Sequence, residues 1–279
     1  MDHLKNSKKL PREVIPVLKK HSQILLNSLG EKLTGIYVHG SAAMGSFTFK
    51  QSDFDYLAIV SSPLTPKERQ KLSKFFLEIY GKDAPGNGIE MSIVVEKFAG
   101  SDFRYPTPYE FHMGTKEQVE FHGLPHKTEM TDPDLAAHFT ITRQRGICVY
   151  GKQIDEVFAD IPRKYFFDSI AKDAEESFNN IQEETGTEKC IVPKYAVLNF
   201  CRVLAFIEEN LIFSKVEGAE WALKNLPEKY FSIISAALQE YRETNSSEKV
   251  DPELLKELAT FAQTKIQNNL KEFAAKEQN

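Results

Sequence analysis

The sequence has little cysteine: three residues in 279, Cys148, Cys190 and Cys201, with no Cys-x-x-Cys pair. An odd count without paired spacing argues against a disulfide framework and favours reduced thiols in the cytoplasm. No uninterrupted apolar run reaches the roughly 18–20 residues that a transmembrane helix needs. The lysine-rich N-terminus has no apolar segment behind it that would indicate a signal peptide. We therefore expect a cytoplasmic protein without a membrane partner.

An excess of positive charge is also missing. The chain carries 35 Lys and Arg against 40 Asp and Glu, which gives a formal net charge of −5. Binding to a nucleic-acid backbone needs a basic surface, so nucleic acid is not expected as a partner. The acidic balance is better suited to a small cationic ligand. The sequence leaves the oligomeric state open, with a monomer as the simplest expectation.

Two regions with different hydrophobic patterns make up the chain. In the first, strand-like runs at residues 34–39, 55–60 and 89–95 alternate with helix-like runs at 11–29 and 66–80. From Phe166 onward the strand pattern disappears, and apolar residues recur every three or four positions. The sequence therefore predicts an α/β (α+β) domain with a mixed sheet at residues 1–162, followed by an all-α helical bundle at residues 163–279.

Capping patterns mark the helices of the second region. A helix is expected over about 194–213, and Ser214 followed by Glu217 has the pattern of a capping box that begins the next one. Asp251 and Pro252 supply the cap and first-turn proline of the last helix. We expect new helices at residues 215 and 252.

Two acidic residues at the start of a strand are the strongest chemical signal. Asp53 and Asp55 are two positions apart, so both side chains face the same side of the strand. Converging carboxylates do not both stay ionised at low cost unless a cation joins them. Oxygen ligands with open coordination positions suit Mg²⁺ that carries a nucleoside triphosphate. Asp53 and Asp55 are therefore candidate metal ligands.

A Gly–Ser turn precedes this acidic pair. An apolar strand ends at Gly40, and Ser41 begins a short helix whose N–H groups and hydroxyl can bind phosphate oxygens. Glycine leaves room for a phosphate to approach the backbone. Alone, the Gly–Ser pair is more often an ordinary turn, and an Asp-x-Asp pair is more often a solvated strand end. Their combination with two apolar strands indicates a nucleotide site.

A third acidic residue lies on the next strand-like run. In residues 89–95 the apolar odd-numbered positions alternate with Glu90, Ser92 and Val94, which face the other side. If this strand neighbours the strand of the aspartates, Glu90 joins them. It could then bind the metal or remove a proton from an attacking hydroxyl. The alternative is an exposed strand glutamate without a role.

At these residues the sequence resembles the polymerase-β-like nucleotidyltransferase superfamily, and more narrowly the aminoglycoside adenylyltransferases that modify streptomycin and spectinomycin. The similarity covers nearly the whole chain, including the helical region. The matching segments are His39-Gly-Ser-Ala, Ser52-Asp-Phe-Asp, Glu90-Met-Ser-Ile-Val, Arg104-Tyr-Pro, Asp132-Pro-Asp-Leu-Ala, Val197-Leu-Asn-Phe-Cys-Arg202, and Ser214-Lys215 through Trp221-Ala-Leu to Leu226-Pro227.

The resemblance implies roles for single residues. Asp53 and Asp55 would hold Mg²⁺, as two ions, and Glu90 would be the catalytic base in contact with the acceptor. The residues implied in ATP binding are Gly40, Ser41, Ser52, Asp134, Arg202, Lys215 and Tyr241. Without the resemblance, Lys215 would be an exposed first-turn lysine, Arg202 the partner of a structural carboxylate, and Tyr241 a core residue.

The acceptor pocket follows the family less closely. Lys116 stands where characterised members carry a tryptophan, and it is a candidate substrate-binding residue. Glu183, Glu184 and Glu188 are candidates to receive an ammonium group. The nucleotide half of the site is therefore better defined than the acceptor half.

The predicted function is Mg²⁺-dependent transfer of AMP from ATP to a hydroxyl of an aminoglycoside or aminocyclitol antibiotic, which gives resistance. Two alternatives stay open: nucleotidyl transfer to another small-molecule or protein hydroxyl, and nucleotide binding without catalysis. Because the implied ATP ligands come from both regions, we expect ATP to bind between the two domains, before the acceptor.

Overall fold

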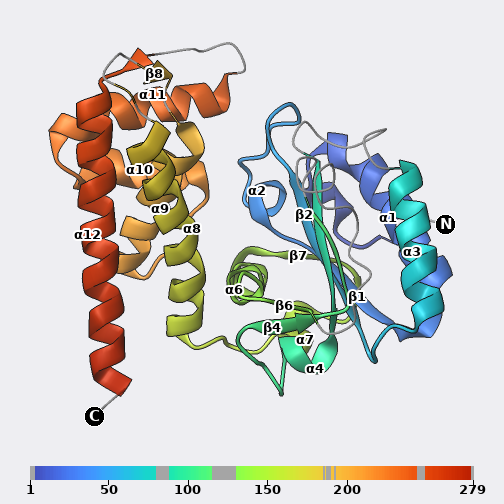
Figure 1. The fold of residues 1–279 in the computed structure, drawn as a ribbon. Helices are drawn as coiled ribbons and strands as arrows, with labels where there is room; N and C mark the ends of the chain where they lie inside the picture. Colours follow the sequence, from blue (N-terminus) through green and yellow to red (C-terminus); the bar gives the residue numbers. More distant parts are fainter. Residues whose placement is uncertain are drawn as a thin grey trace. The chain divides into compact units, whose positions relative to one another are not determined.

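The computed structural model describes residues 4–79, 88–114, 130–184, 186, 190–191, 193–243 and 249–277. The chain divides into two compact units, Met1–Tyr165 and Phe166–Asn279 (Figure 1). That each unit is an independent domain stays a prediction. None of the helices in these ranges is long and apolar enough to cross a membrane.

A five-stranded sheet with the order β5-β3-β2-β1-β7 forms the centre of the first unit. Its central strands β2 and β3 are parallel, whereas the other neighbouring pairs are antiparallel. The parallel pair is joined through helix α3, the crossover that parallel neighbours require. The strands are β1 (Leu33–Val38), β2 (Phe54–Val60), β3 (Ile89–Val95), β5 (Phe111–Met113) and β7 (Ile147–Gly151). The predicted mixed sheet in an α/β unit is confirmed.

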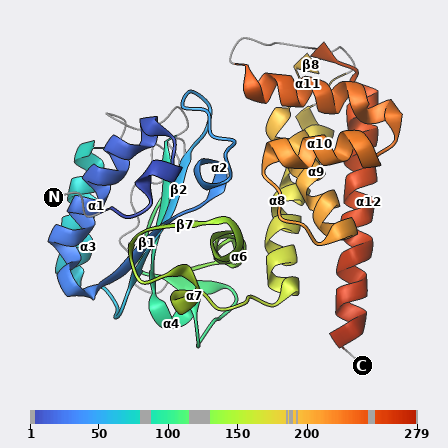
Figure 2. The same ribbon diagram turned by 180° about the vertical axis from the view of Figure 1, so that it is seen from behind.

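Helices cover both faces of this sheet. Helices α1 (Ile15–Leu29) and α3 (Pro66–Ile79) pack on one face, where the odd-numbered residues of β3 join a common core. Helices α6 (Leu135–Arg145) and α7 (Ile154–Val157) pack on the other (Figure 2). Every residue of β2 is buried as a result, so the strand that follows Asp53 is fixed from both sides.

Short elements complete the first unit. They are the 3-10 turns Ser7–Lys9, Arg12–Val14 and Gly30–Lys32, the helices α2 (Gly40–Ala43) and α4 (Glu96–Ala99), and the paired strands β4 (Thr107–Tyr109) and β6 (Met130–Asp132). The sequence analysis assigned no element between residues 100 and 160. Strands of three residues are too short to show a periodic pattern. The buried face of α6 includes the polar Thr142, which weakens the apolar periodicity of this helix.

The second unit is helical, as predicted, with one small addition. Its helices are α8 (Arg163–Glu184), α9 (Lys194–Glu209), α10 (Lys215–Asn225), α11 (Phe231–Arg242) and α12 (Pro252–Glu277), with a 3-10 turn at Glu228–Tyr230. Helix α9 is the central one and packs against α10, α11 and α12. The addition is a pair of two-residue strands, β8 (Cys190–Ile191) and β9 (Lys249–Val250), so the expectation of no strand after Phe166 is wrong at this point.

The ends of the helices follow their capping residues. Ser214 and Glu217 form the predicted capping box: Ser214 Oγ accepts from the Glu217 N–H at 3.2 Å, and Glu217 Oε2 accepts from the Ser214 N–H at 2.8 Å. Helix α9 ends at Glu209, four residues before the predicted end. Asn210 has a left-handed backbone with φ of 58°, a conformation that ends a helix.

Candidate active site

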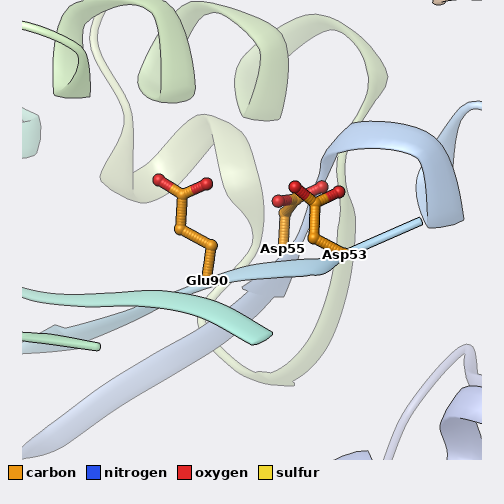
Figure 3. Close-up of side chains that lie close together, drawn as sticks. All are labelled: Asp53, Asp55 and Glu90. Carbon is orange, nitrogen blue, oxygen red and sulfur yellow. The ribbon is translucent and has the colours of Figure 1, made fainter. Parts of the chain in front are cut away.

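Three carboxylates meet at one end of the parallel strand pair. Asp53 directly precedes β2, Asp55 is its second residue, and Glu90 is the second residue of β3. One oxygen from each lies within 4.8 Å of the other two. Figure 3 shows the side chains of Asp53 and Asp55 together, with Glu90 beside them on the neighbouring strand. The structure thus brings together the three acids that the sequence singled out.

The strand register explains this convergence. Asp55 pairs directly with Glu90 across the parallel ladder, and Leu57 pairs with Ser92. Paired residues of neighbouring strands point to the same face of the sheet. A shift of one residue would turn Glu90 into the apolar core on the other face. The apolar residues of both strands therefore fix the position of the acids.

The acidic group is partly removed from water. Asp55 is 8% exposed, and the Glu90 side chain is 27% exposed. Burial raises the pKa of Glu90 above its ordinary value. The nearby charges of Asp53, Asp132 and Asp134 raise this pKa further, and His138 opposes them by lowering it. Such a concentration of negative charge favours the binding of a cation.

Gly40 lies against the Asp55 carboxylate. Its backbone φ is +59°, and a Cβ placed on it would overlap the carboxylate of Asp55. The two segments are also tied together by the backbone, because the His39 N–H donates to the Asp55 carbonyl at 3.1 Å. Only glycine combines this backbone conformation with the space that Asp55 needs.

Two serine hydroxyls flank the acids. Ser41 Oγ, in α2, is buried and has no hydrogen-bond partner among the described residues. Ser52 Oγ accepts a hydrogen bond from the Thr48 N–H at 2.9 Å, so its own proton remains available for donation. A buried hydroxyl without a partner costs free energy that an acceptor such as a phosphate oxygen would recover. Both hydroxyls therefore suit an anionic ligand.

Helix α6 brings a histidine and further acids to Glu90. Asp134 is the exposed N-cap residue of α6, and its backbone N–H donates to Asp132 Oδ1 at 2.8 Å. One turn later, His138 Nε2 lies 3.8 Å from Glu90 Oε1, and its ring centroid is 4.8 Å from that of His39. The sequence analysis missed both histidines as site residues. The spacing of four between Asp134 and His138, on one helix face, was the available signal.

In the second unit, the residues implied in nucleotide binding lie on neighbouring helices. Lys215 Nζ stands 4.6 Å from the ring centroid of Tyr195, and Tyr195 lies edge-on to Tyr241 at 6.2 Å. Tyr195 is 38% exposed, whereas Tyr241 is 3% exposed. The sequence analysis did not single out Tyr195, which joins α9 to the first residue of α10 and to α11. No local pattern distinguishes it from other aromatic residues.

Arg202 is held by a polar chain inside the same unit. One of its terminal nitrogens donates to Asn199 Oδ1 at 2.6 Å, and Asn199 Nδ2 donates to Asp173 Oδ2 at 2.7 Å. Sequence reasoning offered a structural carboxylate as the alternative partner of Arg202. Such a carboxylate, Asp173, is present, and Asn199 connects it to Arg202. A contact between Arg202 and ATP stays a prediction.

The acceptor residues named from the sequence are only partly described. Lys116 and Glu188 lie outside the described residues. Glu183 is exposed near the end of α8, and Glu184 is the last residue of that helix. Their part in binding an acceptor stays a prediction.

Comparison with known proteins points to one family. Residues 156–266 match the family described as aminoglycoside adenylyltransferase, C-terminal domain. A spectinomycin 9-adenylyltransferase from Staphylococcus aureus (strain N315) is 26% identical over 244 residues, which cover 87% of this chain and 88% of that protein. An aminoglycoside (3'') (9) adenylyltransferase from Klebsiella pneumoniae is 26% identical over 234 residues, which cover 82% and 83%.

A solved structure has the same fold. The crystal structure of a spectinomycin adenyltransferase from Enterococcus faecalis, with ATP and spectinomycin, superposes with a TM-score of 0.69 at 21% identity. The match covers 90% of this chain and 98% of the crystallised chain. Both the first unit and the helical second unit are therefore shared with that protein.

Proposed function

We propose that this chain is an aminoglycoside adenylyltransferase, the family to which it is similar over most of its length, and that it transfers AMP from ATP to a hydroxyl of a spectinomycin- or streptomycin-type antibiotic. The family agrees with the reaction class predicted from the sequence. The observation that carries the proposal is the group of three carboxylates from Asp53, Asp55 and Glu90, whose oxygens lie within 4.8 Å of one another. The modified antibiotic would lose its activity, and the host would become resistant.

Mg²⁺ fits the donor set of this site. The three side chains offer only carboxylate oxygens, the hard ligands that Mg²⁺ binds together with phosphate oxygens. We assign Asp53 and Asp55 to the metal, with two ions as the sequence predicted. When bound, Mg²⁺ offsets the negative charge of the transferring phosphoryl group and of the leaving pyrophosphate.

Glu90 is the base in this proposal. Its carboxylate takes the proton of the acceptor hydroxyl, and the hydroxyl oxygen forms a bond to the α-phosphorus of ATP. The bond between that phosphorus and the bridging oxygen breaks, and pyrophosphate leaves with the electron pair. Burial raises the pKa of Glu90, which makes its carboxylate a stronger base than an exposed glutamate. This raised pKa supports the role of base, although the Glu90 carboxylate also lies within reach of a metal held by Asp53 and Asp55.

Hydrogen-bond donors around the acids suit the phosphates. The free space at Gly40 and the hydroxyls of Ser41 and Ser52 favour phosphate oxygens next to the metal. On family grounds we also assign nucleotide contacts to Asp134, Arg202, Lys215 and Tyr241. That both units bind one ATP molecule stays a prediction.

The charge near Glu90 favours a cationic acceptor. Asp132 and Asp134 act on Glu90 from the α6 side, so an ammonium group of the antibiotic would find negative charge there even after the metal has bound Asp53 and Asp55. The role of Lys116 in the acceptor pocket stays part of the proposal.

Pyrophosphate release tests the proposal directly. The purified protein should release pyrophosphate from Mg·ATP with spectinomycin or streptomycin, and the antibiotic should gain the mass of one AMP. Asp53→Asn should abolish both signals, because it removes a metal ligand without a change of volume. Asp155→Asn, an exposed acid of α7, is the matched control and should keep full activity.

Two results would contradict the proposal. One is near-wild-type AMP transfer by Asp53→Asn at saturating Mg²⁺ and ATP. The other is turnover with a protein hydroxyl or an unrelated metabolite while both antibiotics stay unmodified, which would move the protein to the alternative acceptor class. ATP binding without turnover of any acceptor would support the non-catalytic alternative.

A further inference from the structure

Two histidines lie beside the proposed base. His138 Nε2, on α6, is 3.8 Å from Glu90 Oε1, and the side chains of His138 and Glu90 are 18% and 27% exposed. The His138 ring is also tilted by 51° against the ring of His39, at a centroid distance of 4.8 Å. His39 is 3% exposed and its backbone N–H donates to the Asp55 carbonyl. The histidine pair therefore connects α6, the segment before Gly40 and Glu90.

We propose that His138 is a positioning residue for adenylyl transfer, which acts through Glu90 by holding its carboxylate in the orientation that reaches the acceptor hydroxyl. This rests on the proposed role of Glu90 as the base. A distance of 3.8 Å is within ion-pair range but too long for a hydrogen bond. The contact therefore limits the positions of the carboxylate by packing and does not bind one oxygen rigidly.

The surroundings of Glu90 explain why such a residue is needed. Among the described groups that act on Glu90, His138 lowers the pKa of its carboxyl, whereas the charges of Asp53, Asp132 and Asp134 raise it. A glutamate side chain has three rotatable bonds, and holding it in one rotamer costs conformational entropy. Without His138, repulsion from the acids on both sides would spread the carboxylate over several orientations.

His39 fixes the histidine in turn. Its burial and the adjacent His138 hold the pKa of His39 well below its ordinary range, so His39 stays neutral beside Asp55. The buried His39 ring has little freedom to move, and the His138 ring packs against it. The ring contact with His39 thus restricts the movement of the His138 ring.

Substitution of His138 should lower the rate of chemistry and leave nucleotide binding nearly unchanged. We expect His138→Leu to lower kcat about tenfold, less than the roughly 100- to 10,000-fold that a general base contributes, because Glu90 itself is still present. The KM for Mg·ATP should change by less than about twofold. His138→Gln keeps a polar group at this place and should recover part of the loss. Gln144→Leu, an exposed position of the same helix, is the control and should leave both constants unchanged.

A double-substitution experiment separates positioning from a structural role. Glu90→Asp keeps the carboxylate but shortens the side chain by one CH2 group, so His138 no longer meets it. If His138 acts through Glu90, His138→Leu should cost much less in this background than in the wild type. Melting temperatures of all variants identify any loss of folded protein, and His138→Gln carries the test if His138→Leu does not fold.

The outcomes are distinct. If His138→Leu lowers kcat by the same factor in the wild-type and Glu90→Asp backgrounds, the positioning role is overturned. The proposed function would still stand. A rise in KM for Mg·ATP with unchanged kcat would overturn it too. Absence of AMP transfer to either antibiotic by the wild-type protein, in the same assay, would overturn the proposed function and this inference together.

Discussion

Gly40 shows how closely the backbone approaches the acids at the scale of one residue. The glycine has a positive φ, and its α-carbon faces the Asp55 carboxylate with no space for another atom. Gly30 has nearly the same φ, +53° against +59°, but nothing lies within 4 Å of a Cβ placed there. The chain thus offers two glycines of similar positive φ in different surroundings.

Alanine at these two positions should therefore have different effects. Gly30→Ala should cost about 1–3 kcal/mol of stability, the strain of a Cβ on a backbone region that only glycine readily adopts, and keep full activity. Gly40→Ala should pay the same strain and also displace the Asp55 carboxylate, so that AMP transfer falls by about 100-fold or more, as expected for misplaced reacting groups. Steady-state kinetics and urea unfolding measure both effects. Equal activity of the two variants would contradict the proposed closeness of Gly40 to the metal site.

Cys201 illustrates a residue whose chemistry is suppressed by burial. Its thiol lies in the core of the second unit, and burial raises its pKa from 9.0 to about 12. Burial also raises the pKa of Cys148. The thiolate is the reactive form, so neither side chain should react with thiol reagents in the folded protein.

In a Cys190→Ser variant, we expect no reaction of the native protein with Ellman's reagent at pH 8 and reaction of two thiols in concentrated urea. The raised pKa also has a consequence for stability. Between pH 9 and about 12 the folded state keeps the Cys201 proton and the unfolded state loses it. Stability should therefore fall as the pH rises through this window, by up to about 1.4 kcal/mol per pH unit. Cys201→Ala should remove this part of the slope, and an unchanged slope would contradict the assignment.

At the scale of elements, the close contact between α9 and α10 determines where Arg202 lies. A Cβ on Gly218 of α10 would be 2.9 Å from Arg202 Cγ, and 3.0 Å and 3.2 Å from the Arg202 backbone N and Cα. The flexible side chain can give way, but the backbone of the central helix cannot move without its neighbours. The absence of a side chain at Gly218 therefore allows α9 and α10 to pack closely. It also leaves space for the Arg202 side chain to contact Asn199.

Gly218→Ala should destabilise the protein although alanine is the better helix former. The gain in helix propensity is about 1 kcal/mol, whereas overpacking of a close helix contact costs about 1–3 kcal/mol. We expect a net loss in the free energy of unfolding, measured with urea, and a displaced Arg202. Lys224→Ala on the same helix, at an exposed position, is the control. A more stable Gly218→Ala would show that the two helices separate at little cost.

At the scale of the whole molecule, the candidate ATP ligands come from both compact units. The acids and serines lie in the first, and Arg202, Lys215 and Tyr241 lie in the second. The assignment of the first group to ATP binding rests on the geometry of the described residues. The assignment of the second group rests on similarity to the family. Measuring the affinity for ATP in variants of the second group therefore tests whether both groups bind the same nucleotide.

Lys215→Ala should weaken ATP binding by about 1.5–3 kcal/mol, the range for a lost hydrogen bond to a charged group. Isothermal calorimetry with Mg²⁺ and a non-hydrolysable ATP analogue measures it, with Lys224→Ala of the same helix as the control. Unchanged affinity would confine the nucleotide site to the first unit. The antibiotic should bind measurably only when the nucleotide is present, and equal affinity without it would contradict the predicted order of binding.

The sequence by itself determined the features that depend on neighbours in the chain. The alternation around Glu90, the spacing of Asp53 and Asp55, the Gly–Ser turn and the capping box of Ser214 each occupy a few consecutive residues, and short-range geometry decides what such patterns form. The division into an α/β region and a helical region follows from hydrophobic periodicity in the same way.

The tertiary structure alone decided which distant segments meet. The parallel register that sets Asp55 opposite Glu90, the approach of Gly40 to Asp55, and the placement of His138 beside Glu90 join residues that lie 15 to 48 positions apart in the chain. The strand pair β8–β9 joins residues 58 and 60 positions apart, and the contact of Tyr195 with Lys215 joins residues 20 positions apart. Such contacts form because the sheet and helices bury their apolar faces together, and the polar side chains meet where that packing brings them.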